Sequence, residues 1–134
     1  MSIKDFYIGQ TAELSKIFSD EEVKCFANMS GDLNPIHLDD EYAKKSIFKK
    51  RILHGFQTGA LISAVIGMKL PGPGAIYLHQ EMNFKKPAYI GETVRAFVTI
   101  TSIKEEKSII FLETKCLNAN GDVLIDGDAI VKLI

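Results

Sequence analysis

The stretch FQTGALISAVIGMKL, residues Phe56–Leu70, is apolar on nearly every side and decides the fold. As a helix it would span about 22 Å, and it would need burial on most sides because it has no continuous polar face. Gly59 and Gly67 each lower helix propensity by about 1 kcal/mol relative to Ala, so their small size indicates close packing. The stretch therefore predicts a central helix packed against a sheet.

The chain after this helix alternates β-branched and aromatic residues with polar ones. Pro71–Gly74 (PGPG) breaks the helix. The following segments predict long antiparallel strands, because turn-forming residues separate them: Ala75–Phe84, Glu92–Ile103, Ile109–Leu117 and Val123–Leu133. A sheet wrapped around a buried helix satisfies this order of elements. We therefore predict an α+β fold.

The chain before the central helix predicts one more strand and two short helices. Thr11–Phe18 alternates as a strand does. Its inward-facing side chains should be Ala12, Leu14 and Ile17. Ser19 or Asp20 can cap a helix that ends at Gly31, because an N-cap favours a side-chain oxygen and a helix end favours glycine. Asp39 or Asp40 can cap a second short helix in the same way.

Length and composition exclude several classes of protein. The chain of 134 residues is 46% hydrophobic and 25% charged, which is typical of one globular domain over residues 1–134. A net charge of −1 argues against nucleic acid or an anionic membrane as a partner. Cys25 and Cys116 match no metal-binding spacing and are expected in the core. Met1–Gln10 lacks the apolar run of a signal peptide, and no membrane span is present, so we expect a cytoplasmic protein.

One run of basic residues stands out against this balanced charge. It consists of Lys44, Lys45, Lys49, Lys50 and Arg51. A solvated surface explains such a run. The specific alternative is a site where the side chains meet the phosphates of a charged ligand as point charges.

Asp32–Leu38 (DLNPIHL) carries the candidate chemistry. Pro35 lacks an N–H and restricts Asn34, so we expect irregular structure here. In a helix, Asp32 and His37 would differ by about 140° around the axis, and in a strand they would lie about 16 Å apart. Only a compact turn, which Asn34-Pro35 favours, could bring the carboxylate and the imidazole together.

A carboxylate and a histidine that meet can hold one water molecule and move protons in both directions. Histidine suits this task because its unperturbed pKa of about 6.5 lets it act as acid or base near neutral pH. Spacing alone leaves the alternatives open: Asp32 as a cap of the turn, and His37 as a structural histidine.

The second candidate feature is the start of the central helix, at Leu53–Phe56 (LHGF). A helix N-terminus offers free N–H groups and the positive end of the helix dipole. Gly55 lets a ligand approach the backbone closely, so its N–H could bind a thioester oxygen that gains negative charge. The alternative is a glycine needed only for the turn. We expect His54 to be structural.

These motifs resemble the MaoC-type (R)-specific enoyl-CoA hydratases and the hot-dog fold that carries them. The resemblance rests on Asp32–Asp39 (DLNPIHLD) followed by Ile52–Gly55 (ILHG). Leu70–Leu78 (LPGPGAIYL), Phe84–Pro87 (FKKP) and Ala129–Leu133 (AIVKL) extend it over nearly the whole chain, towards the short bacterial hydratases of polyhydroxyalkanoate supply.

The resemblance implies a role for each matching residue. Asp32 and His37 would grip the water, Gly55 would supply the oxyanion N–H, and Asn34 would shape the turn and bond near the site. The hydroxyl of Ser63 would join the Asp–His network, although a bond back to its own helix is the alternative. The acyl chain would lie in a tunnel shaped by Leu61, Ile62, Val65, Phe84 and Ile130.

The implied reaction is reversible syn addition of water to a trans-2-enoyl-CoA, which yields an (R)-3-hydroxyacyl-CoA. It implies an acyl-CoA thioester substrate, a homodimer, and no metal or redox cofactor. Three alternatives remain: a thioesterase of the same fold, a 3-hydroxyacyl-acyl-carrier-protein dehydratase that uses the same residues, and a non-catalytic acyl-CoA-binding subunit.

Overall fold

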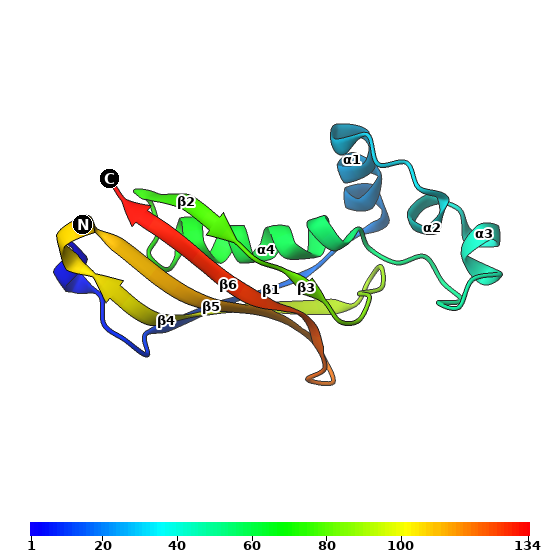
Figure 1. The fold of residues 1–134 in the computed structure, drawn as a ribbon. Coiled ribbons are helices and arrows are strands. Elements are labelled where there is room, and N and C mark those ends of the chain that lie inside the picture. The colour runs from blue at the N-terminus through cyan, green and yellow to red at the C-terminus, as the bar shows by residue number, and fades with distance from the viewer.

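The computed structural model describes residues 1–134 as a six-stranded antiparallel sheet that curves along one long helix (Figure 1). The strands follow the order β1 (Thr11–Ile17), β4 (Thr93–Lys104), β5 (Ile109–Asn118), β6 (Val123–Leu133) and β2 (Ala75–Gln80), and β3 (Asn83–Phe84) also pairs with β6. Two short 3-10 helices complete the list of elements: η1 (Ile3–Asp5) precedes β1, and η2 (Glu105–Lys107) lies between β4 and β5. The predicted α+β fold of the hot-dog type is confirmed.

The central helix α4 (Gly55–Met68) packs on the inner face of the sheet. Alternate residues of β4 are buried there: Val94, Ala96, Val98 and Ile100. Gly59 needs its small size, because a Cβ at this position would lie 2.5 Å from Met82 Sδ. A Cβ at Gly67 would meet nothing within 4 Å, so the packing prediction is wrong for Gly67.

One side of α4 is open, contrary to the prediction of burial on most sides. Phe56 and Met68 are 68% and 72% exposed. The sheet of one chain covers only the side of α4 that carries Leu61, Ile62 and Val65.

The predicted strand Ala75–Phe84 is interrupted. It divides into β2 and β3, both paired with β6, and the β2–β6 register shifts between Tyr77 and His79. Gly127 of β6 passes so close to the break that a Cβ there would lie 1.9 Å from the carbonyl oxygen of Glu81. The two backbones therefore approach so closely at the break that position 127 accommodates only a glycine.

The N-terminal elements largely follow the prediction. Helix α1 (Asp20–Ser30) is capped by Ser19 and ends at Gly31, whose φ is 83°. Helix α3 (Asp40–Lys44) is capped by Asp39.

Two predicted core residues in this region are exposed. Ile17 is 57% exposed and Phe18 is buried instead, because the period of two puts Ala12, Leu14 and Lys16 on the inner face. Cys25 is exposed on α1, whereas Cys116 is buried as predicted.

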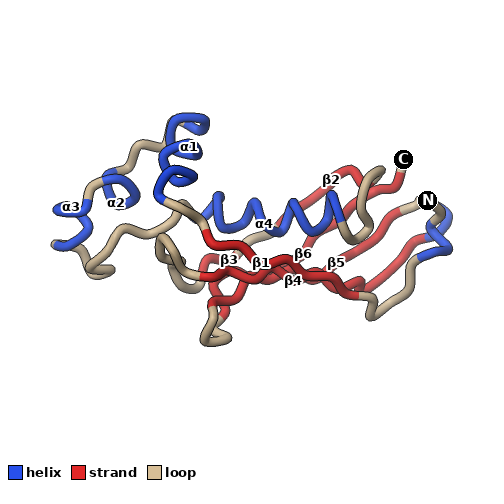
Figure 2. The backbone as a smooth tube through the Cα atoms, turned by 180° about the vertical axis from the view of Figure 1, so that it is seen from behind, coloured by secondary structure: helices blue, strands red, loops and turns tan.

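Helices α1, α2 (Pro35–Leu38) and α3 gather beyond one end of the sheet, near the start of α4 (Figure 1). Both chain termini lie at the opposite end, as the reverse view also shows (Figure 2). Because the short helices gather near the start of α4, they place the Asp32–His37 segment beside its N-terminus.

None of the helices has the length and apolarity needed to cross a membrane.

Candidate active site

The segment expected to be irregular contains a one-turn helix, α2. Pro35 begins it, and its missing N–H costs nothing at that position. The side chain of Asn34 accepts a hydrogen bond from the N–H of Ile36 at 3.3 Å, and Asp32 Oδ1 accepts one from the N–H of Asn34 at 3.2 Å. The prediction of irregular structure is wrong here, but the compact turn that it required is present.

This turn brings Asp32 and His37 together. Ligand atoms of the two side chains, with one of His54, all lie within 4.8 Å of one another. His37 is only 8% exposed, whereas Asp32 is exposed. One water molecule can bridge a carboxylate and an imidazole over such a gap, since each hydrogen bond spans about 2.8 Å.

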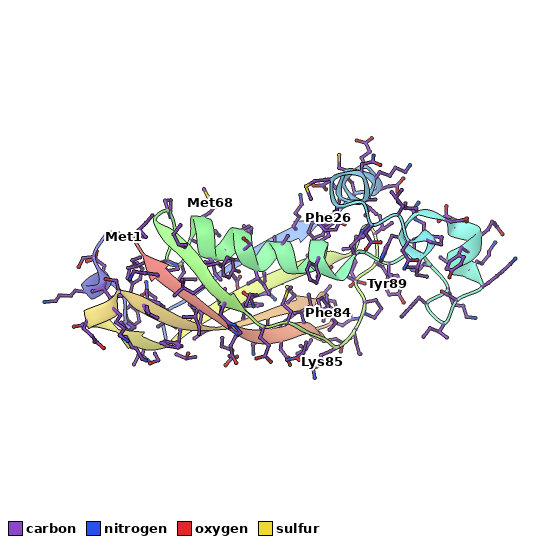
Figure 3. All side chains as sticks on the ribbon, turned by 45° about the horizontal axis from the view of Figure 1, so that its top comes forward. Met1, Phe26, Met68, Phe84, Lys85 and Tyr89 are labelled. Atoms are coloured by element: carbon purple, nitrogen blue, oxygen red, sulfur yellow. The ribbon has the colours of Figure 1, made fainter.

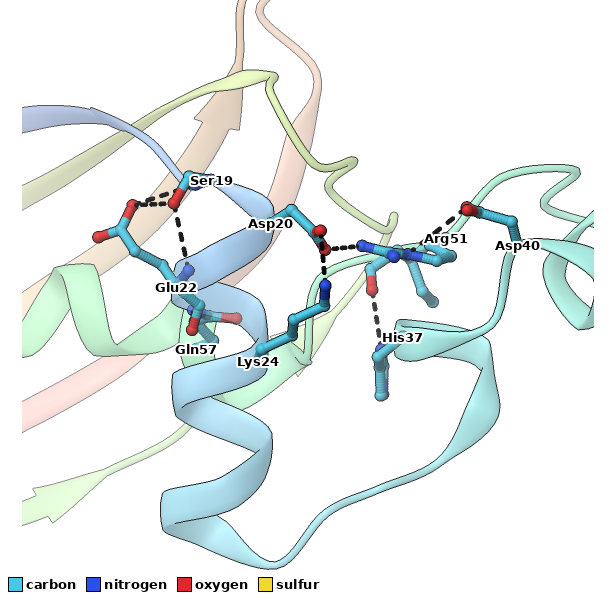
Figure 4. Close-up of polar contacts among 9 residues, drawn as sticks. Ser19, Asp20, Glu22, Lys24, His37, Asp40, Arg51 and Gln57 are labelled. Carbon is cyan, nitrogen blue, oxygen red and sulfur yellow. Dashed lines mark hydrogen bonds and ion pairs between the residues drawn. The ribbon is translucent and has the colours of Figure 1, made fainter.

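In its neutral form the ring of His37 is held in one tautomer. Its Nδ1 lies 2.8 Å from the carbonyl oxygen of Ile52 (Figure 4), and because a carbonyl only accepts, Nδ1 carries the hydrogen and Nε2 carries the lone pair. Burial lowers the pKa of His37, and the charge of His54 adds to this, while the bond to Ile52 and the charge of Asp32 act in the opposite direction. His37 is therefore set up as a base at neutral pH.

His54 touches both members of this pair, although the sequence indicated only a structural role. It is 2% exposed, and its ring stacks on the ring of His37 with the centroids 3.9 Å apart. Its Nε2 donates to the carbonyl oxygen of Asp32 at 2.9 Å, and its Nδ1 has no partner. His54 is the N-cap of α4 without a capping hydrogen bond. That unusual cap residue is the sequence signal for its role.

The geometry of the two histidines suits proton transfer better than metal binding. Their ring planes are stacked at an angle of 25° with the centroids 3.9 Å apart, so no single ion close to the rings can lie in both ring planes, where the nitrogen lone pairs point. They cannot converge on one ion at the distance of about 2.1 Å that a His ligand needs. One nitrogen of each ring also bonds a backbone carbonyl.

A cavity of about 350 Å³ connects His37 with the start of α4. Gly55, Phe84, Lys85 and Ile125 are among the residues that line it, and Figure 3 labels Phe84 and Lys85. The N–H of Gly55 has no acceptor within the protein. The cavity therefore contains an imidazole and, at the positive end of a helix, an unused backbone donor.

Ser63 lies away from the Asp–His pair within one chain. It is eight residues beyond Gly55, which is about 12 Å along the helix, and it is on the open side of α4. The phenol of Tyr77 donates a hydrogen bond to Oε1 of Gln80 at 2.9 Å, and burial raises its pKa to about 12 while the hydroxyl of Ser63 lowers it. The role of Ser63 in the network stays a prediction.

Of the five residues predicted to contact the acyl chain, Phe84 alone lines this cavity. Leu61, Ile62 and Val65 belong to the core between helix and sheet, with exposures of 3%, 0% and 0%. Ile130 lies in another hollow beside Phe111. The structure does not bring these four to the cavity of a single chain, and their contact with an acyl group stays a prediction.

Comparison with known proteins fits this geometry. The model of the MaoC like domain matches residues 7–120. The chain is 45% identical to the (R)-specific enoyl-CoA hydratase of Rhodospirillum rubrum, over 96% of this chain and 88% of that protein. It is 41% identical to the (R)-specific enoyl-CoA hydratase of Aeromonas caviae, over 99% of both.

A solved structure extends the likeness to three dimensions. The (R)-hydratase from A. caviae involved in PHA biosynthesis superposes with a TM-score of 0.95 and 40% identity, over 98% of this chain and 99% of that one. The similarity in sequence and fold therefore extends over nearly the whole chain, including the segments that carry Asp32, His37 and Gly55. The chain belongs to the MaoC-like family.

Proposed function

We propose that this chain is an (R)-specific enoyl-CoA hydratase, which adds water reversibly to trans-2-enoyl-CoA and yields (R)-3-hydroxyacyl-CoA. The observation that carries the proposal is the meeting of Asp32 and a neutral His37 within 4.8 Å. The hydratases of R. rubrum and A. caviae, at 45% and 41% identity, support it. We assign the reaction to one domain that spans residues 1–134.

The tautomer of His37 suggests the path of the proton. In the hydration direction the carboxylate of Asp32 accepts a hydrogen bond from the water. Nε2 of His37 takes the other hydrogen of the water as a proton while the oxygen bonds to C3. The imidazolium then delivers that proton to C2 on the same face, which gives syn addition and returns His37 to its neutral form. Asp32 stays ionised throughout and stabilises the imidazolium.

Gly55 serves the thioester oxygen in this scheme. Negative charge develops on that oxygen while C3 is attacked, and the unused N–H of Gly55 is placed to bind it at the positive end of α4. Removing one donor of this kind costs about 2.7–4 kcal/mol in measured enzymes. We expect a contribution of this size from the oxyanion contact at Gly55.

We also propose that two copies of the chain pair. β2 is an edge of the sheet, and three of its side chains are 47%, 38% and 54% exposed: Ile76, Tyr77 and Leu78. Phe56 and Met68 are two further exposed apolar side chains, on the open side of α4. Burial against a second copy would remove a free strand edge and exposed apolar side chains from water. Ser63 would then reach an Asp–His pair only across the dimer.

The relatives and the two cysteines support a proposal for the cellular setting. The A. caviae structure is named for PHA biosynthesis, and we propose the same use for the (R)-3-hydroxyacyl-CoA made here. Both cysteines are free thiols, which suits a reducing cytoplasm.

The decisive assay follows the loss of enoyl absorbance with crotonyl-CoA, then with a series from C4 to C12, and resolves the enantiomers of the product. The proposal predicts rapid hydration and the (R) product. Release of free thiol without hydration would instead indicate a thioesterase. Binding of crotonyl-CoA without any reaction would indicate a non-catalytic subunit.

A further inference from the structure

A second hollow, of about 460 Å³, lies beside the active-site cavity. Lys44, Lys49, Lys50, Arg51 and Tyr89 line most of it, and we call it the basic cleft. The two hollows have no lining residue in common, but residues of one segment face both. Phe48 and Ile52 line the cavity, whereas the three basic residues between them line the cleft. An isolated antiparallel β-bridge pairs Ile52, which lines the cavity, with Tyr89, which lines the cleft.

The cleft lies close to the catalytic imidazole. Ile52, whose carbonyl accepts the hydrogen bond of His37, directly follows Arg51 (Figure 4). Lys49 is three residues before Ile52, so their Cα atoms lie within about 10 Å of each other. Lys85 of the active-site cavity and Tyr89 of the cleft are four residues apart on the segment that follows β3.

Arg51 has a structural task in this cleft. It pairs with Asp20, and its Nε lies 3.7 Å from Asp40 (Figure 4). Lys24 also pairs with Asp20, at 3.1 Å. These contacts neutralise both acidic side chains that line the cleft.

The three lysines of the cleft keep their charge unpaired. Lys44, Lys49 and Lys50 make no ion pair. Lys50 lies 5.0 Å above the ring of Tyr89. Glu92 is a further carboxyl near Lys50: burial raises its pKa, and the charge of Lys50 lowers it. A protein of net charge −1 thus concentrates positive charge beside its active site.

We propose that Lys44, Lys49 and Lys50 bind the phosphate groups of coenzyme A while the acyl thioester occupies the active-site cavity. This inference rests on the proposed function, because it assigns the far end of the same substrate. The thioester and the phosphates sit at opposite ends of the pantetheine arm, and ammonium groups bind phosphates as point charges. The volume of the cleft is that of a small-molecule site, which favours a nucleotide over the broad surface of an acidic carrier protein.

The test measures the binding of butyryl-CoA, a saturated thioester that cannot be hydrated, by titration calorimetry. One variant combines Lys44→Gln, Lys49→Gln and Lys50→Gln. The matched control combines Lys4→Gln, Lys107→Gln and Lys132→Gln, three exposed lysines near the chain termini.

The cleft variant should raise the Kd about ten-fold, which corresponds to about 1.4 kcal/mol, and added salt should narrow the difference from wild type. The control should bind as wild type does. A cleft variant with the Kd of the control would overturn the proposal.

Crotonyl-pantetheine, which lacks the nucleotide, separates this proposal from the hydratase assignment. Its kcat/KM should be the same in wild type and in the cleft variant. If the cleft variant lost kcat/KM for crotonyl-pantetheine as well as for crotonyl-CoA, the result would contradict a phosphate site. Failure of wild type to hydrate any thioester would sink the proposed function but leave the butyryl-CoA result decisive. Unchanged butyryl-CoA binding, with lost turnover of a crotonyl-carrier protein, would assign the lysines to protein docking and refute the proposal.

Discussion

Gly55→Ala tests whether the start of α4 holds the thioester oxygen. The added Cβ would lie 2.7 Å from Cε1 and 2.9 Å from Cδ1 of Phe84, so this ring must move. Phe84 is 51% exposed and can rotate towards solvent, and alanine has the higher helix propensity, by about 1 kcal/mol. The free energy of unfolding should therefore change by less than about 1 kcal/mol.

The activity should fall much further than the stability. The methyl group enters the cavity that the thioester must share, so the oxygen can no longer approach the Gly55 N–H. Loss of such a contact costs about 2.7–4 kcal/mol, or roughly a 100- to 1,000-fold drop in kcat/KM for crotonyl-CoA. Initial rates of absorbance loss give this ratio, and thermal unfolding gives the stability.

Phe84→Leu separates the two consequences of the methyl group. Alone it should change kcat/KM only a few-fold, and combined with Gly55→Ala it should relieve the contact with the ring without restoring activity. Full recovery in the double variant would show that the displaced ring, and not the lost N–H, caused the defect. A single Gly55→Ala variant within three-fold of wild type would refute the oxyanion role altogether.

Further predictions concern His54, His37 and the edge strand. His54→Gln, which can keep a side-chain donor to the carbonyl of Asp32, should retain more kcat than His54→Phe, which keeps only the stacking on His37; equal kcat values would contradict the positioning role. Because the folded pKa of His37 is lowered below 6.5, the neutral base persists into mild acid. The acid limb of kcat/KM should therefore lie below pH 6.5, and the free energy of unfolding should decrease as pH falls through 6.5 towards the folded pKa; a limb above 6.5 would refute this. Leu78→Lys should yield monomers in light scattering, and a persistent dimer would exclude the β2 edge as the interface.

The local chemistry of the chain predicted much of the fold. Ser19 and Asp39 cap helices, and Gly31 ends one, because these preferences depend on a few neighbouring residues. The turn through Asn34-Pro35, which brings Asp32 close to His37, was also predictable, because turn preferences depend on a few neighbouring residues. Its one-turn helix was missed because Pro35 also suits a first helical position.

Contacts between distant residues account for what the sequence could not show. His54 reaches Asp32 across 22 residues and has a partnerless Nδ1, and no spacing rule identifies such a contact. The position of Ser63 on an open helix face depends on what a second chain covers. The close approach of Gly127 to Glu81 joins two segments far apart in the chain.

In the proposed reaction Asp32 and His37 hold the water that adds to the substrate, and Asp32→Asn removes the carboxylate from this pair. The amide keeps the shape and can still accept the hydrogen bond from Asn34, so the turn should persist. With butyryl-CoA binding and thermal stability as controls, kcat for crotonyl-CoA hydration should fall by about 100- to 10,000-fold, the range of general acid–base contributions. A folded variant that binds butyryl-CoA and keeps kcat within ten-fold of wild type would contradict the account.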